Sequence, residues 1–197
     1  MDSDGYLSQL ADIFNGITVN TPSISAIIAI VLAGVLLLAS GFASASEIAF
    51  FSLTPSDRND IDEQNHPSDE KISALLGDSE RLLATILITN NFVNVTIIML
   101  CNFFFMNVFV FHSPLAEFLI LTVILTFLLL LFGEIMPKIY SAQKTLAFCR
   151  FSAPGIYFLE KLFRPIATVL VRSTTFLNKH FVKKSHNISV DELSHAF

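Results

Sequence analysis

Tryptophan is absent from this chain of 197 residues, cysteine occurs twice, and charged residues make up only 15% of it. Cys101 and Cys149 form no metal-binding or disulfide pattern. The chain instead has a hydrophobic content of 53% and contains 20 phenylalanines, a composition that is unusual for a water-soluble domain. The composition therefore predicts a membrane protein.

Basic residues are missing from the first part of the chain: no lysine or arginine precedes Arg58. Three apolar runs are long enough to cross a hydrocarbon layer of about 30 Å, which takes about 20 helical residues. These runs are Ile24–Leu53, Leu82–Phe111 and Leu115–Ile135. Basic residues lie between the first two runs and after the third, and such residues favour the cytoplasmic side. We therefore expect a multi-pass protein of the cytoplasmic (inner) membrane, with the N-terminus outside and the C-terminus in the cytoplasm.

The predicted fold is an all-α membrane protein with three transmembrane helices and juxtamembrane interfacial helices. Residues 1–21 are expected to form an extracytoplasmic polar tail. No basic region precedes the first apolar run, so this run is expected to stay in place as a span and not to be cleaved as a signal peptide. Residues 22–144 are the predicted three-span domain, in which residues 54–80 form a short helix and turns at the cytoplasmic surface.

Residues 145–184 mix aromatic and aliphatic side chains with recurring basic residues, and Pro154 and Pro165 interrupt the uncharged runs. A fourth span is one interpretation. A belt of helices in the inner interface, with basic residues near the headgroups of the lipid bilayer, fits the pattern better. Residues 185–197 become polar and predict the start of a cytoplasmic linker to a further soluble domain.

The segment LFGEIMPKIY at the end of the third run combines a glycine, a carboxylate, a proline and a lysine. Proline has no amide hydrogen, so Pro137 leaves the carbonyl of Gly133 without its helical partner. The freed carbonyl lies beside Glu134, and discontinuous transporter helices present oxygen atoms to cations at such breaks. The alternative is that Glu134 and Lys138, four residues apart, form an ordinary ion pair where the helix meets water.

Polar residues also interrupt the other two spans. Asn90 and Asn94 are four residues apart and share one face of the second span, and Ser40, Ser44 and Glu47 share one face of the first. Each group has a simpler interpretation. Asparagines can bond between helices without a ligand, serine can bond back to its own helix, and a glutamate near a helix end can be interfacial.

Successive spans run in opposite directions, so the polar residues of all three are expected at one level in the inner half of the membrane. One hydroxyl, two amide oxygens, one carboxylate and one carbonyl would form an all-oxygen set. Such a set suits Mg²⁺, Ca²⁺ or Na⁺ and not zinc or copper. The predicted metal ligands are Ser44, Asn90, Asn94, the Gly133 carbonyl and Glu134. Pro137 is the predicted helix kink, and Lys138 and Glu47 are candidates for gating or pairing.

Three motifs stand in the order and spacing of one family: SASEIAFFSL at Ser44–Leu53, ILITNNFVN at Ile86–Asn94 and GEIMPK at Gly133–Lys138. With them the chain resembles the transmembrane domain of the CNNM/CorC family of magnesium transporters. The resemblance implies a three-span homodimer with a juxtamembrane helical belt, a cytoplasmic CBS-pair module after it, and Mg²⁺ bound by the ligands named above in a cavity open to the cytoplasm. The segments SEIAFFSLTPSD and NISVDELSHAF are most similar to the gliding-motility-associated GldE branch.

The leading hypothesis is the transmembrane domain of a Mg²⁺ transporter or exporter that binds dehydrated Mg²⁺ in an inward-open cavity. Moving two charges outward against about 100 mV costs roughly 4.6 kcal/mol, so export would need coupling, for which Na⁺ entry is the candidate. The alternative is a non-transporting dimeric membrane scaffold, with motility or secretion components as partners and a structural ion site. An enzyme is not expected, because the sequence has no nucleophile with a base, histidine cluster or phosphate-binding loop. We expect no nucleic-acid partner.

Overall fold

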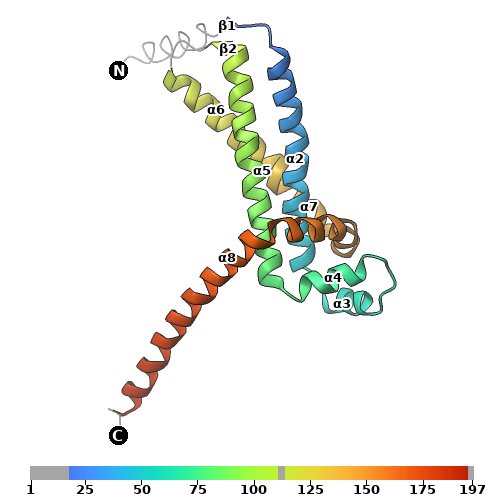
Figure 1. Ribbon diagram of the computed structural model, residues 1–197, viewed down its shortest axis with the longest axis vertical. Coiled ribbons are helices and arrows are strands. Elements are labelled where there is room, and N and C mark those ends of the chain that lie inside the picture. Colours follow the sequence, from blue (N-terminus) through green and yellow to red (C-terminus); the bar gives the residue numbers. More distant parts are fainter. Residues whose placement is uncertain (1–17, 111–113, 195–197) are drawn as a thin grey trace, which may run out of the picture.

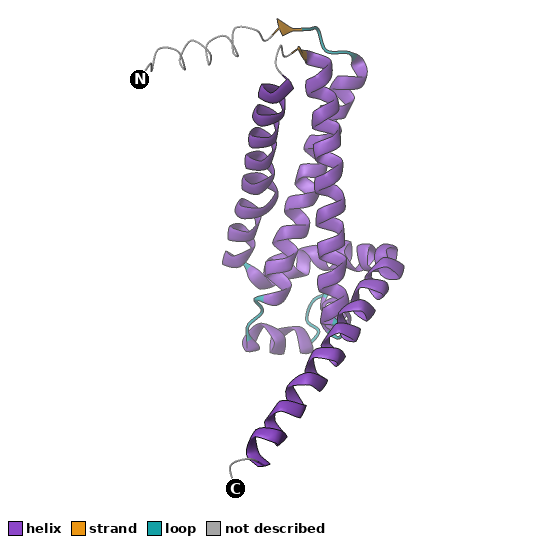
Figure 2. Ribbon diagram, turned by 90° about the vertical axis from the view of Figure 1, so that its left-hand side faces the viewer, coloured by secondary structure: helices purple, strands orange, loops and turns teal. Residues whose placement is uncertain are grey.

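The computed structural model describes residues 18–110 and 114–194, and the regular structure of these residues is helical apart from one pair of short strands (Figures 1 and 2). Side chains of the last helix are described as far as Ser173. The helices are α2 (Ile24–Phe51), α3 (Pro55–Asp62), α4 (Asp69–Leu76), α5 (Ser79–Val108), α6 (Pro114–Leu128), the π-helix η1 (Leu129–Ile135), α7 (Met136–Gln143) and α8 (Thr145–Ser194). The strands are β1 (Thr18–Val19) and β2 (Phe109–Val110).

Within the described residues, three segments are long and apolar enough to cross a membrane: Ile24–Phe51, Ser79–Val108 and Glu117–Gln143. They form one bundle in which α2 packs against both other spans (Figures 1 and 2). The chain is therefore a multi-pass membrane protein, and the predicted fold class is confirmed. The second helix ends at Val108, before the predicted limit of Phe111, because the chain becomes extended in β2.

Side-chain caps define where several helices begin. Ser23 accepts a hydrogen bond from the amide of Ala26 at the start of α2, and Asp78 accepts one from the amide of Arg81 at the start of α5. Each cap satisfies an amide that has no partner within the helix. The loop between these spans holds two short helices, α3 and α4, where the sequence predicted one.

The short strands connect the chain before α2 to the end of α5. Thr18 pairs with Val110 and Val19 with Phe109 in an antiparallel arrangement. Part of the predicted polar tail is therefore a strand, and residues 1–17 of that tail lie outside the described residues.

The third span is not a regular α-helix. It passes from α6 into the π-helix η1 and then into α7, and the amide of Met136 donates to the carbonyl of Leu131, five residues earlier. Pro137 stands in the first turn of α7, directly after the π-helix, and has no amide hydrogen to donate to the turn before it. The backbone is thus irregular where the sequence predicted a break, and the irregular segment includes Gly133 and Glu134.

The last helix differs from the prediction. The sequence predicted several interfacial helices over residues 145–184 and a linker from residue 185, whereas α8 continues as one helix to Ser194. Pro154 and Pro165 lie inside it. Each proline removes one backbone donor, which can bend a helix without ending it. In Figure 1, α8 passes across α2 and α5 and then runs away from the bundle toward the C-terminus.

The helices α3, α4 and α8 form a basal layer that packs against the bundle (Figure 1). Asp69 of α4 is completely buried, and Arg150 of α8 donates to both of its carboxylate oxygens, at 2.8 and 3.0 Å. Burial alone would raise the pKa of Asp69, but hydrogen bonds from Arg150 and from the amide of His66 hold it below its ordinary value. This ion pair links the loop between the first two spans to α8.

Two apolar clusters fill the bundle at different levels. The basal cluster joins α2 and α5 to the basal layer and consists of Ala49, Phe50, Leu53, Ile61, Ile72, Leu75, Leu82, Ile86, Cys149, Ala153 and Ile156. The upper cluster joins α2, α5 and α6 and consists of Ala33, Val93, Ile97, Cys101 and Leu125. The buried polar residues Ser40 and Ser44 fall between these clusters along α2.

Candidate cation site

Polar side chains of α2 and α5 meet between the two apolar clusters. The hydroxyl oxygen of Ser40 lies 2.8 Å from Oδ1 of Asn90 and 2.6 Å from Oδ1 of Asn94. The hydroxyl oxygen of Ser44 lies 3.4 Å from the same oxygen of Asn90. Ser40 and Ser44 are fully buried. The structure therefore brings three of the predicted ligands, Ser44, Asn90 and Asn94, to one level.

This group contains more acceptors than its protons can satisfy well. Four oxygen atoms meet here, and only the two serine hydroxyls supply protons to these contacts. Each hydroxyl has a single proton, so Ser40 can donate to only one of its two amide neighbours at a time. The Ser44 contact with Asn90 is long for an O–H···O hydrogen bond. The oxygen lone pairs that these hydrogen bonds do not use are available to a cation.

Two glycines let the third span approach α2 at this level. A Cβ on Gly133 would lie 3.1 Å from the Ser40 hydroxyl oxygen, and a Cβ on Gly41 would lie 2.9 Å from Cγ of Pro137 and 3.3 Å from the carbonyl oxygen of Phe132. Real Cβ atoms are rarely this close to other atoms, so a Cβ at Gly41 would push the third span away, whereas a Cβ at Gly133 would displace the Ser40 hydroxyl. The backbone that precedes Glu134 is consequently packed directly against Ser40.

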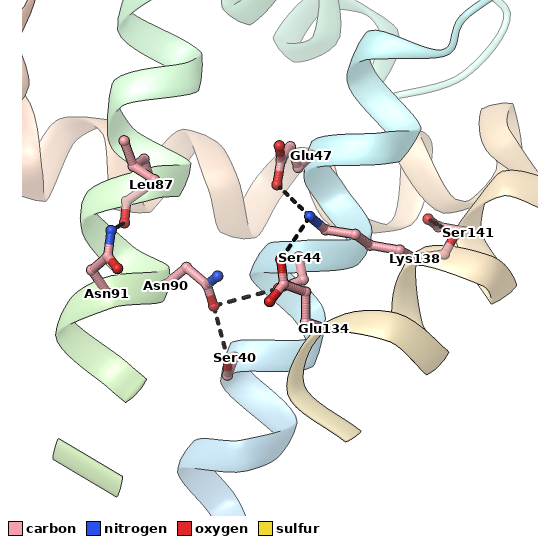
Figure 3. Close-up of polar contacts among 9 residues, drawn as sticks. All are labelled: Ser40, Ser44, Glu47, Leu87, Asn90, Asn91, Glu134, Lys138 and Ser141. Carbon is pink, nitrogen blue, oxygen red and sulfur yellow. Dashed lines mark hydrogen bonds and ion pairs between the residues drawn. The ribbon is translucent and has the colours of Figure 1, made fainter. Parts of the chain in front are cut away.

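The carboxylate of Glu134 is engaged in an ion pair. Nζ of Lys138 lies 3.2 Å from Oε1 of Glu134 and 3.2 Å from Oε2 of Glu47, so one ammonium group joins two carboxylates (Figure 3). In Figure 3 the Glu134 side chain projects toward α2. The alternative of a Glu134–Lys138 pair is therefore realised in the structure, and Glu47 is part of the same group. The Glu134 side chain is 44% exposed, in contrast to the buried serines.

Sequence reasoning missed two residues of the site. Ser40 makes the shortest contacts to both asparagines, although it was not among the predicted ligands, and Gly41 provides the close approach to Pro137. The signal for Ser40 was its spacing of four residues from Ser44. Asn91, between the two site asparagines, points elsewhere: it is exposed, and its amide nitrogen donates to the carbonyl of Leu87 at 2.9 Å (Figure 3).

The donor set defines what the site can bind. Among the described residues, no group of three or more His, Cys, Asp or Glu side chains could hold a metal ion. The available donors are hydroxyl and amide oxygens with one nearby carboxylate, a set that suits hard cations such as Mg²⁺, Ca²⁺ and Na⁺. A cavity of about 360 Å³ lies elsewhere, between α5 and α6, and its lining includes Asn102 and Glu117 and none of the predicted ligands.

The fold and the polar residues define a class of protein, namely a helical multi-pass membrane domain with an oxygen-rich cluster inside the bundle. The model of the cyclin M (CNNM) transmembrane N-terminal domain matches residues 29–197, which is most of the chain. The chain therefore belongs to the CNNM transmembrane domain family. This family is linked to Mg²⁺ transport, and its members are typically transporters and not enzymes.

Two curated relatives agree with this assignment. A UPF0053 protein of Haemophilus influenzae is 31% identical over 134 residues, which cover 68% of this chain and 31% of the relative. A UPF0053 protein of Synechocystis is 26% identical over 140 residues, which cover 71% of this chain and 39% of the relative. The chain spans only about a third of the length of these relatives.

Proposed function

We propose that this chain is the membrane domain of a Mg²⁺ transporter or exporter, and that Mg²⁺ binds without its full hydration shell at the oxygen cluster. The observation that carries the proposal is the convergence of Ser40, Ser44, Asn90 and Asn94 inside the bundle. Polar groups at membrane depth are costly unless they are satisfied or functional. Glu134 and the Gly133 carbonyl complete the set when Mg²⁺ is bound. Glu134 supplies the negative charge.

The surroundings of the cluster support access from the cytoplasm. On one side the upper apolar cluster separates Ser40 and Asn94 from the far ends of the spans. On the other side the charged groups of Glu134, Lys138 and Glu47 are partly exposed. Water and ions enter along charged, solvated surfaces and not through packed apolar ones. We infer an inward-open arrangement, with the N-terminus outside and the C-terminus in the cytoplasm.

The direction of transport determines what else the protein needs. Mg²⁺ export against an interior-negative potential of about 100 mV costs roughly 4.6 kcal/mol, which inward movement of Na⁺ would supply. With one carboxylate at the site, bound Na⁺ leaves a neutral site and bound Mg²⁺ leaves a charge of about +1. The two ions would therefore compete for the same oxygen atoms.

We further propose that the functional unit is a homodimer and that α8 connects it to a cytoplasmic CBS-pair module. The groove between α5 and α6 supports a second copy, because the polar side chains of Asn102 and Glu117 line it among mostly apolar ones. Such groups are stabilised by partners on neighbouring helices. Assignment to the GldE branch, with motility or secretion components as partners, rests on the sequence resemblance alone.

The binding proposal is tested by thermal stability in detergent against Mg²⁺ concentration, with Ca²⁺ and Na⁺ as competitors. A ligand that binds only the folded state raises stability by RT ln(1 + [L]/Kd). We expect a Mg²⁺-dependent rise in melting temperature that Glu134→Ala and Asn94→Ala remove. Asn91→Ala is the matched control, since Asn91 is exposed and bonds to its own helix, and it should keep the full response.

Transport is tested separately in liposomes that contain a Mg²⁺-sensitive dye. Flux in the wild type that is lost in Glu134→Ala supports a transporter. A wild type that is stabilised by Mg²⁺ but gives no flux with or without a Na⁺ gradient contradicts transport and supports a dimeric scaffold with a structural ion site.

A further inference from the structure

The ion pairs around Lys138 suggest how Glu134 becomes available to a cation, an inference that rests on the proposed function. Lys138 lies 3.2 Å from both Glu134 and Glu47. An ammonium group has three protons and can donate to two carboxylates at once. In this arrangement Lys138 occupies one oxygen of the carboxylate that Mg²⁺ would use. Lys138 is thus a built-in competitor for Glu134.

Binding of Mg²⁺ at Glu134 requires Lys138 to move or to stay beside a second positive charge. Like charges within a few ångströms repel each other. A lysine that simply left Glu134 would lose its partner at membrane depth, which is also unfavourable. Glu47 removes this conflict, because Lys138 can release Glu134 and remain paired.

The positions of the three residues fit such an exchange. Glu47 lies on α2, one turn beyond Ser44, so it is attached to the helix that supplies the hydroxyl oxygens. Glu134 lies in η1 and Lys138 in α7, on either side of the change from π-helix to α-helix. The two carboxylates therefore approach Lys138 from different helices, and Lys138 can be held by α2 alone.

We propose that Glu47 is a positioning residue, which keeps the Lys138 ammonium paired while Glu134 binds the cation. Glu47 acts through Lys138 and does not itself contact Mg²⁺. Its removal leaves Lys138 with Glu134 as its partner, so Mg²⁺ must break that pair to bind. Removal of Lys138 leaves Glu134 free, and Glu47 then no longer matters for Mg²⁺ affinity.

A double-mutant cycle tests this dependence. The Kd for Mg²⁺ is measured by titration calorimetry on the purified protein in lipid nanodiscs for the wild type, Glu47→Gln, Lys138→Met and the double variant. We expect Glu47→Gln to weaken Mg²⁺ binding about fivefold, an effect of the size found for coupled neighbours. Lys138→Met should bind as tightly as the wild type or more tightly. The double variant should match Lys138→Met within about twofold.

Two further variants separate positioning from folding and from general charge effects. Glu47→Asp keeps the carboxylate and should retain most of the wild-type affinity, and circular dichroism shows whether each variant is folded. Glu70→Gln removes an exposed carboxylate of α4, outside the three spans, and should leave the Kd unchanged.

The outcomes distinguish this proposal from the proposed function. If Glu47→Gln weakens Mg²⁺ binding equally with and without Lys138, Glu47 is a direct ligand or a general charge and the proposal is overturned. If Glu47→Gln leaves the Kd unchanged, the three residues are only a stabilising ion group, and the proposal also fails. A wild type that does not bind Mg²⁺ at all refutes the proposed function itself, and the exchange with it.

Discussion

Gly41 gives the sharpest test of how the third span packs on α2. A Cβ at this position would lie 2.9 Å from Cγ of Pro137 and 3.3 Å from the carbonyl oxygen of Phe132. Neither atom can turn away, because one belongs to a ring and the other to the backbone. Gly41→Ala should therefore push α2 and the third span apart.

The expected loss of stability in Gly41→Ala follows from comparison with Gly34→Ala on the same helix, where a Cβ would meet nothing within 4 Å. Both substitutions gain the same helix propensity, about 1 kcal/mol, so this contribution cancels between them. The remaining difference is the cost of overpacking, about 1–3 kcal/mol. For a chain of this size each kcal/mol corresponds to about 2–4 °C. Gly41→Ala should melt roughly 2–12 °C below Gly34→Ala.

The assay uses the composition of the chain. Without tryptophan, intrinsic fluorescence is a weak probe, but Cys101 and Cys149 are both buried and free. A thiol-reactive dye that fluoresces on labelling therefore follows unfolding directly. Gly41→Ala should also lose part of its stabilisation by Mg²⁺, because Ser40 precedes it in the site. Equal melting temperatures for the two variants would refute the close approach on which the site depends.

Three other predictions concern separate parts of the molecule. Gly133→Ala should change stability little but weaken Mg²⁺ binding about tenfold, because the new methyl group displaces the Ser40 hydroxyl, and calorimetric titration checks this. Asp69→Asn should cost about 3 kcal/mol at neutral pH. The folded-state pKa of Asp69 is depressed, so its stabilisation is present above the ordinary value of 3.8 and is lost as the pH falls through the lower folded value. The free energy of unfolding, measured from pH 7 to pH 3, should therefore fall less in Asp69→Asn than in the wild type. An equal fall in both proteins would contradict the role of the pair. Burial raises the pKa of Cys149 to about 12, so a charged maleimide at pH 8 should label it only after unfolding, whereas a cysteine placed at exposed Phe158 should react at once.

The sequence alone determined the class of fold, because the membrane imposes it. A hydrocarbon layer accepts only segments that satisfy their own backbone, so length and apolar content are enough to locate the three spans. An irregular backbone near the end of the third span could also be predicted, since Pro137 lacks an amide hydrogen whatever surrounds it. Its form as a π-helix over Leu129–Ile135 depends on the packing against α2 and could not be predicted.

The tertiary structure decided which polar groups meet. Helical spacing placed Asn90 and Asn94 on one face, but it could not show that Ser40 approaches both of them more closely than Ser44 does. That choice depends on the rotation and separation of two helices. Glycines at the contact set the separation of α2 from the third span.

Contacts between charged residues also divide into those that the sequence predicted and those that only the tertiary structure showed. The spacing of four residues predicted a pair between Glu134 and Lys138, because side chains four apart are neighbours on any helix. The participation of Glu47 and the burial of Asp69 against Arg150 join residues that are distant in the chain. Local spacing determines contacts within one helix, whereas contacts between helices exist only once the bundle has formed.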